Sequence, residues 1–233
     1  MSDYITRPSK LAAQYYSPRF ESSGSNENTE AGRARHKALE ALFGGDDKLV
    51  NALHSFDSDG VRWAHSYILR TAPMDGYPIE SEKKIEIFRD GEVILDGTPD
   101  VVCGDHIFDL KWFEHDYKAQ MAAYALGLMQ KRKTLNATVH ILFGATRIVK
   151  SYSILKSEAE NIVYTTYDKV RDPNTPCSVS SYCSWCSRSL GCSVLKEHVD
   201  KVAVGLEMVP VEDLHIVSPA QVASALNLAK VVK

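Results

Sequence analysis

The stretch Gly97-Thr98-Pro99-Asp100-Val101-Val102-Cys103-Gly104-Asp105-His106-Ile107-Phe108-Asp109-Leu110-Lys111 contains two apolar runs separated by a Gly-Asp dipeptide. Glycine at the first position of a two-residue loop suits a type II′ turn, and such a turn fixes the register of a β-hairpin. Counting outward from the turn pairs Asp100 with Asp109, with Cβ atoms about 4.5–5.5 Å apart. The stretch therefore predicts a hairpin that holds two carboxylates side by side.

A lysine completes this arrangement, because Lys111 lies two residues after Asp109 and so on the same face of the strand. Like charges opposed across two strands are destabilising, and a divalent cation between them removes that penalty. Oxygen ligands of this kind suit Mg²⁺ or Mn²⁺. The Lys111 ammonium could then orient or activate an attacking water and support charge developing on a phosphate. The opposite face is expected in the core and carries Val101, Cys103, Phe108 and Leu110. The simpler interpretation of Asp-x-Lys is a solvated strand edge with a surface ion pair.

The remainder of the chain shows helical and strand-like patterns on both sides of this hairpin. Helices are predicted around 10–16, over 32–43 and over 46–69 with a break near 57–60, and later over 116–131, over 157–170 and from 219. Strands are predicted over 79–88, 93–96, 98–103, 106–112, 138–143 and 147–154, with Asp90-Gly91 as a second hairpin turn. This order predicts an α/β fold with a mixed central β-sheet flanked by helices, rather than a doubly wound nucleotide-binding fold.

Composition excludes several classes of protein. With 233 residues, 44% hydrophobic and 24% charged, the chain is expected to form one globular domain with a small appendage. A formal net charge of −3 argues against a basic nucleic-acid coat protein. The sequence lacks a Gly-rich phosphate loop, a secretion signal and an apolar run of membrane-spanning length, so a cytoplasmic protein that is not a nucleotide-driven motor is expected.

The helix predicted after the hairpin carries Gln120 and Tyr124, four residues apart and therefore on one face. Together with the preceding residues they resemble a known family. Asp100, Asp109-Leu110-Lys111 and Gln120-x-x-x-Tyr124 are similar to the second and third motifs and the Gln-x-x-x-Tyr motif of RecB-like PD-(D/E)XK nucleases, which share a restriction-endonuclease-like core. Upstream, the segment 32–40 resembles the helical first motif of that group and contains His36. The similarity spans roughly residues 8–195.

The resemblance implies a role for each matching residue. His36, Asp100, Asp109 and the Leu110 carbonyl would hold the metal ion, and Lys111 would be the catalytic lysine. Gln120 and Tyr124 would position the substrate strand, and Glu82 is a weaker candidate for a role behind the ligands. The implied activity is that of a Mg²⁺- or Mn²⁺-dependent deoxyribonuclease, acting as an exonuclease on single strands or duplex ends. A non-catalytic DNA-binding or assembly module and a zinc-stabilised regulatory protein are the alternatives.

Four of the five cysteines form the pattern Cys177-x5-Cys183-x2-Cys186-x5-Cys192. Spacing alone favours a structural Zn²⁺ site, although an iron–sulfur cluster uses the same ligands. The last three cysteines resemble the Cys-x2-Cys-x5-Cys run of RecB-like nucleases with a [4Fe-4S] cluster, such as the CRISPR-associated Cas-four family and the AddB subunit. Ser17 stands where that family has its fourth cysteine, so Cys177 is the expected replacement, which would make the cluster local.

These patterns divide the chain into a nuclease core with an N-terminal helical region (1–175), a four-cysteine segment (176–200) and a C-terminal linker and helix (201–233). The resemblance extends to some phage-encoded nucleases and implies DNA as the substrate, with recombination or CRISPR-type proteins as partners. A bacterial, archaeal or phage-infected cytoplasm is the expected location. Strand polarity and oligomeric state are left open by the sequence.

Overall fold

The computed structural model describes residues 7–22, 27–73 and 76–198, and its centre is a five-stranded sheet in the order β1-β4-β5-β6-β7. Strands β5 and β6 are parallel and are joined through helix α5, whereas the β1–β4, β4–β5 and β6–β7 pairs are antiparallel. The predicted mixed α/β fold is therefore confirmed. The strands are β1 (Glu80–Ser81), β4 (Val101–Cys103), β5 (His106–Lys111), β6 (Asn136–Phe143) and β7 (Ile148–Leu155).

The hairpin β4–β5 has the register predicted from its turn. Val102 pairs with Ile107 and Cys103 with His106, and Gly104 has the positive φ of 57° that a type II′ turn requires at its first position. Strand β4 begins at Val101, three residues later than expected. The apolar face predicted for this hairpin is buried, as its four side chains are at most 1% exposed.

The strand predicted over 79–88 is wrong as one element, because it divides between two sheets. Its first part is β1, paired with β4, and its second part is β2 (Ile85–Arg89), which pairs with β3 (Glu92–Gly97) in a separate two-stranded sheet. The chain turns at Glu82, whose φ is 49° and whose amide donates to the Asp100 carbonyl at 2.9 Å. An alternating pattern reports which face a side chain occupies but not which strand is its partner.

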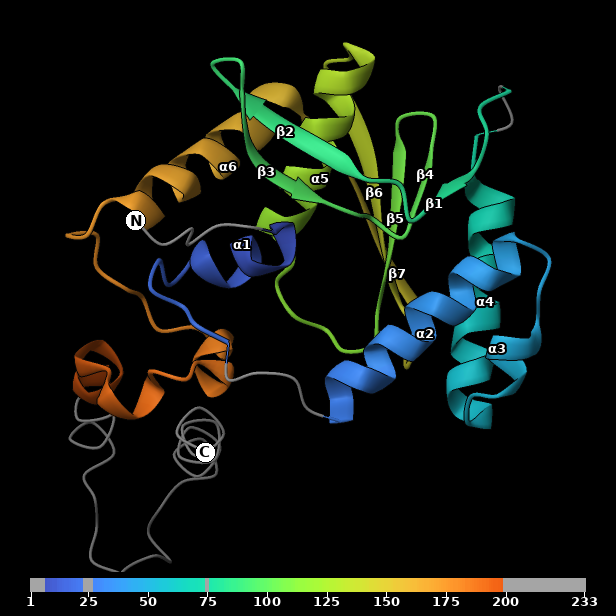
Figure 1. Cartoon of the computed structure of the whole chain (residues 1–233), viewed down its shortest axis with the longest axis horizontal. Helices are drawn as coiled ribbons and strands as arrows, with labels where there is room; N and C mark the ends of the chain where they lie inside the picture. Colours follow the sequence, from blue (N-terminus) through green and yellow to red (C-terminus); the bar gives the residue numbers. More distant parts are fainter. Residues whose placement is uncertain (1–6, 23–26, 74–75, 199–233) are drawn as a thin grey trace, which may run out of the picture.

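Helices cover both faces of the central sheet (Figure 1). One face packs on α5 (Lys118–Arg132), with α1 (Pro8–Gln14), α6 (Lys156–Arg171) and the β2–β3 hairpin around it. The other face packs on α2 (Glu27–Phe43) and α4 (Ser55–Thr71), which are linked by the short helix α3 (Lys48–Asn51). The helix break lies at 52–54 rather than near 57–60, because Gly60 is inside α4 and its missing side chain makes room for the ring of Trp112.

The cysteine segment follows α6 and contains the short 3₁₀ helices η1 (Ser181–Trp185) and η2 (Ser189–Gly191), drawn in orange below the core in Figure 1. The linker and the helix expected from Pro219 lie outside the described residues. Over the part of the chain that the structure covers, no helix is both long and apolar enough to cross a membrane.

Candidate metal-dependent active site

Three neighbouring strands bring three acidic residues to one level of the sheet. The β1–β4 register, in which Glu80 pairs with Val102, continues to place Glu82 opposite Asp100. The β4–β5 register continues in the same way to place Asp100 opposite Asp109, although the ladder itself ends one residue earlier. Asp100 is fixed here because its Oδ2 accepts a hydrogen bond of 2.6 Å from the Leu110 amide.

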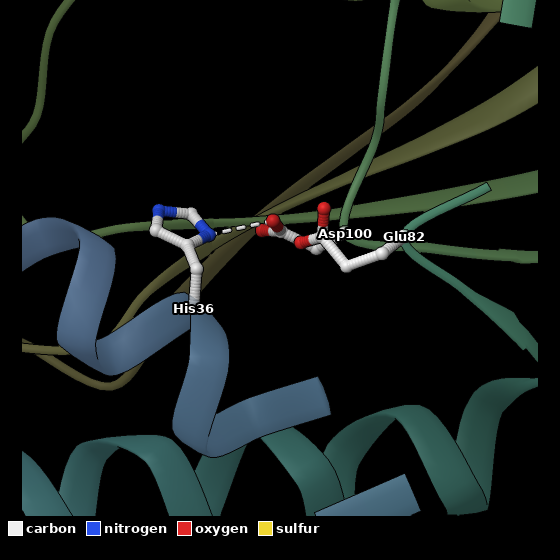
Figure 2. Close-up of side chains that lie close together, drawn as sticks. All are labelled: His36, Glu82 and Asp100. Carbon is white, nitrogen blue, oxygen red and sulfur yellow. Dashed lines mark hydrogen bonds and ion pairs between the residues drawn. The ribbon is translucent and has the colours of Figure 1, made fainter. Parts of the chain in front are cut away.

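Helix α2 adds an imidazole to this row of carboxylates. The Nδ1 atom of His36 lies 2.5 Å from Oδ1 of Asp100. One donor atom from each of His36, Glu82 and Asp100 lies within 4.8 Å of the other two. Figure 2 shows His36 approaching from its helix while the two carboxylates approach from the sheet side. Since His36 and Asp100 are 64 residues apart, this site exists only when α2 is packed correctly against the sheet.

A buried ion pair lies beside these three residues. The Lys111 ammonium is 2.5 Å from Oδ2 of Asp109, and the two side chains are only 15% and 3% exposed. The contact has the charge and distance of an ion pair, but Asp109 Oδ2 makes no hydrogen bond of regular geometry. Lys111 also lies over the ring of Tyr117, 5.0 Å from its centroid. The lysine is thus held at the sheet end with its charge directed at the carboxylates.

Burial and neighbouring charges shift the pKa values of these groups in different directions. The Asp100 carboxylate raises the pKa of His36 against the effect of the ring's burial. Burial tends to raise the pKa of Asp100, but the charge and hydrogen bond of His36 outweigh it and the pKa is lowered. Burial raises the pKa of Asp109, and the nearby Asp100 charge adds to the effect despite Lys111. Asp100 is therefore the more readily ionised of the two carboxylates, while Asp109 needs a compensating cation.

The two flanking groups respond to the same charges. Burial tends to lower the pKa of Lys111, but the Asp109 carboxylate raises it above the ordinary value for lysine. Burial, followed by the charge of Asp100, raises the pKa of Glu82 to about 7. A cation bound among these residues would reverse the shift of Glu82, because an adjacent positive charge favours the ionised carboxylate.

The two predicted residues of α5 lie behind this row of charges. The Gln120 amide donates to the Tyr124 hydroxyl at 3.3 Å, and that hydroxyl donates to the Thr98 carbonyl at 3.1 Å. Both side chains are buried, at 4% and 5% exposure. Thr98 is two residues before Asp100, so the pair supports the loop that carries this carboxylate. Their contact with a substrate strand remains a prediction.

Sequence reasoning identified most of this constellation and underestimated one member. His36 and Asp100 come together as expected, with Asp109 and Lys111 adjacent, but the third donor within 4.8 Å is Glu82, which was expected only behind the ligands. The structure places the Leu110 amide on Asp100; coordination by its carbonyl remains a prediction. The missed signal was the pairing of β1 with β4, which local alternation does not reveal.

The donor set fits a divalent cation. Carboxylate oxygens suit Mg²⁺ and Mn²⁺, and an imidazole nitrogen suits transition-metal ions. The pairing of buried carboxylates and the Asp109 oxygen without a regular hydrogen bond are both features that a cation would stabilise. We therefore assign His36, Glu82 and Asp100, with Asp109 alongside, as the candidate metal site.

The four clustered cysteines line a second place in the fold. Cys177, Cys183, Cys186 and Cys192 all border one cavity of about 190 Å³, and Ser17 borders it too. No three of these sulfurs lie within 4.8 Å of one another among the residues the structure describes. Ser17 and Cys177, the two positions considered for the fourth ligand, thus border the same space.

The cysteine segment pairs with the N-terminal part of the chain. The expectation of a local cluster concerns its ligands and stays a prediction. The amide of Ser178 donates to the Tyr16 carbonyl, that of Ser187 donates to the Glu21 carbonyl, both at 2.9 Å, and Ser22 forms a β-bridge with Cys186. Spacing between cysteines cannot reveal these contacts, because backbone groups make them.

The same segment also reaches the loop that follows Lys111. The Tyr182 hydroxyl donates to the Asp116 carbonyl at 2.6 Å. The Trp185 and His115 rings meet edge to face, with centroids 4.6 Å apart. The cysteine segment therefore packs against the loop that follows Lys111.

Comparison with known proteins gives distant structural likenesses alone. No protein-family model matches the chain, and no curated protein matches it. One similar solved structure is SSO0001, a Sulfolobus protein, with 17% identity, a TM-score of 0.41 and coverage of 83% of this chain and 87% of that chain. Another is an alkaline exonuclease from Laribacter hongkongensis, with 10% identity, a TM-score of 0.33 and coverage of 86% and 95%. Both TM-scores are low, so neither likeness assigns a function to this chain.

Proposed function

We propose that this chain is a DNA nuclease that hydrolyses phosphodiesters with Mg²⁺ or Mn²⁺, acting as an exonuclease on single strands or duplex ends. The observation that carries the proposal is the convergence of His36, Glu82 and Asp100 within 4.8 Å beside the buried Asp109–Lys111 ion pair. A surface salt bridge does not require burial, a third carboxylate or an imidazole from a separate helix. This combination suits metal-assisted hydrolysis of a phosphodiester.

A divalent ion bound by these residues would supply an activated water and withdraw charge from a phosphate oxygen. The protein's own groups would do the rest. Lys111 stays protonated beside the Asp109 carboxylate, so its ammonium donates hydrogen bonds rather than accepting a proton. It would orient the attacking water and stabilise the charge that develops on the phosphate. Asp109 in turn holds the ammonium in place.

Gln120 and Tyr124 would support the candidate metal site indirectly, through the loop that carries Asp100. Their hydrogen bonds end on the Thr98 carbonyl and so keep the Asp100 loop in position. A lost hydroxyl at Tyr124 would loosen this loop, whereas a lost ammonium at Lys111 would remove a group of the reaction itself. The two substitutions should therefore differ in severity.

The four cysteines are proposed to hold a [4Fe-4S] cluster, with Cys177 as the fourth ligand and structural Zn²⁺ as the alternative. The observation that supports one shared metal centre is that all four cysteines border one cavity. The packing of Tyr182 and Trp185 against the 115–117 loop gives such a cluster a structural role.

The test is cleavage of end-labelled linear and circular single-stranded DNA with Mn²⁺ or Mg²⁺. Wild-type protein should cut the linear substrate and lose activity in a chelator. Lys111→Ala should abolish cleavage while metal and DNA binding persist, and Asp109→Asn should lose metal affinity as well. Lys118→Ala is the matched control, because Lys118 lies on α5 with a 51% exposed side chain in a surface ion pair with Glu158.

Three results would contradict the proposal in whole or in part. DNA binding without cleavage in either metal would favour the non-catalytic module. Wild-type cleavage rates in Lys111→Ala protein would remove the lysine from the mechanism. Cleavage of circular DNA would retain the nuclease but exclude a strictly exonucleolytic action.

A further inference from the structure

An aromatic side chain connects the helix that carries His36 with the strand that carries Asp109 and Lys111. Trp112 directly follows Lys111 at the end of β5, and Arg35 directly precedes His36 in α2. The Arg35 guanidinium carbon lies 4.0 Å from the centroid of the Trp112 ring system, within the range of a cation–π contact. The neighbours of the proposed catalytic lysine and of the proposed histidine ligand are therefore in direct contact.

The Trp112 ring is enclosed by backbone on further sides. A Cβ atom at Gly60 in α4 would lie 2.5 Å from the ring, and one at Gly144 after β6 would lie 2.3 Å from it. Contacts this short leave no room for any side chain at these two positions. Phe56 of α4 meets the indole edge to face, with centroids 5.8 Å apart. These contacts, made by α4 and by the residue after β6, fix the position of the Trp112 ring.

Arg35 is held as firmly as the ring it covers. Its Nη2 atom lies 3.1 Å from Oδ2 of Asp57 in the first turn of α4, and the two side chains are 13% and 18% exposed. A guanidinium can make both contacts at once, because its plane stacks on the ring while its edge meets a carboxylate. A lysine ammonium at this position could keep the ion pair but not the planar stack.

We infer that Arg35 and Trp112 are positioning residues that set the place of His36 against the carboxylates of the sheet, an inference that rests on the proposed metal site. His36 is the one donor of the site that comes from a helix, and its 2.5 Å contact with Asp100 depends on where α2 lies. The Arg35–Trp112 contact joins that helix to the strand end one residue from Lys111. Groups that orient metal ligands without touching the ion typically change metal affinity by about 10- to 100-fold when they are lost.

The experiment measures Mn²⁺ binding to the full chain without DNA, either by calorimetry or by the electron paramagnetic resonance signal of free Mn²⁺. Trp112→Leu and Arg35→Lys should each raise the Kd for Mn²⁺ by about 10-fold or more. Trp112→Phe keeps an aromatic ring under Arg35 and should restore most of the affinity. Arg35→Lys also guards against a folding defect, because the substitution conserves the charge that pairs with Asp57.

The matched control is Trp63→Leu. Trp63 is a half-buried tryptophan of α4 whose ring packs on Tyr67 of the same helix. Its loss should lower the thermal midpoint as Trp112→Leu does, while the Kd for Mn²⁺ stays at the wild-type value. A purely structural role for Trp112 predicts instead that the two tryptophan variants behave alike.

The outcomes separate this inference from the proposed function. Wild-type Mn²⁺ affinity in both Trp112→Leu and Arg35→Lys would overturn the inference and leave the proposed function standing. An equal loss of affinity in Trp63→Leu would overturn it too. A wild-type protein that binds no Mn²⁺ would overturn the proposed function, and with it this inference.

Discussion

Replacing Lys111 by methionine removes the cation that compensates the buried Asp109 carboxylate. Methionine keeps most of the apolar stem, so the change is chiefly one of charge. The ammonium lies 2.5 Å from Oδ2 of Asp109, and the Asp109 side chain is only 3% exposed. Breaking a buried pair by removing one partner typically costs about 3–5 kcal/mol, because the remaining charge has no compensation.

Lys111→Met should therefore lower the free energy of unfolding by about 3–5 kcal/mol in metal-free buffer. With a urea m-value of about 3 kcal/mol/M, the unfolding midpoint should fall by about 1–1.7 M. The measurement is urea unfolding with a chelator present, followed by circular dichroism. Asp109→Asn combined with Lys111→Met is the control, since removal of both charges should recover most of the lost stability.

A loss below about 1 kcal/mol would refute this reasoning, because it is the range of solvent-exposed ion pairs. The same conclusion would follow if the double variant were no more stable than Lys111→Met. Either result would mean that water reaches Asp109 in the folded protein or that Asp109 takes up a proton once Lys111 is gone, and the buried charge would then not be the cause of the loss.

Three further predictions follow from the site and the cysteine segment. Tyr124→Phe should reduce cleavage less than Lys111→Ala does, and equal inactivity of the two proteins in single-turnover assays would place the hydroxyl in the reaction itself. Purified protein should be brown and contain iron and acid-labile sulfide, and Cys177→Ser should remove the colour whereas Ser17→Ala should not. A colourless protein with one zinc ion per chain would contradict the proposed [4Fe-4S] cluster. In metal-free protein the raised pKa of His36 should stabilise the fold fully below the unfolded pKa of about 6.5, and this stability should be lost as the pH rises through the higher folded pKa. The unfolding free energies of wild-type and His36→Gln protein, measured in urea across neutral pH, should therefore converge at high pH, and parallel pH profiles would exclude the effect.

The sequence predicts those parts of the site that depend on local geometry. The turn at Gly104 sets the register of β4 and β5, so the level of Asp100 and Asp109 follows by counting along two strands. Strand periodicity then places Lys111 beside Asp109, as the ion pair shows. Each of these steps spans only a few residues, and a strong turn signal fixes the starting point.

The remaining parts depend on contacts between distant segments, which a single sequence does not record. Glu82 reaches the site because the chain leaves the sheet in a left-handed conformation directly after β1. The contact of Arg35 with Trp112 needs two glycines, in α4 and after β6, neither of which is marked by a local motif. Indeed Gly60 misleads local reasoning, since a glycine within a helical pattern suggests a break when its actual role is close packing.

The backbone pairing of residues 16–22 with the cysteine segment also constrains the order in which the chain can fold. During synthesis the strands and helices between these two segments emerge before the cysteine segment does. The partners of Tyr16, Glu21 and Ser22 are synthesised about 160 residues after those three residues. Contacts of such sequence separation form late, because closing the intervening loop costs entropy before it gives stability. The N-terminal segment can therefore form these native contacts only after the cysteine segment has been synthesised. The last step of folding is then one in which the start of the chain and the cysteine segment are ordered together.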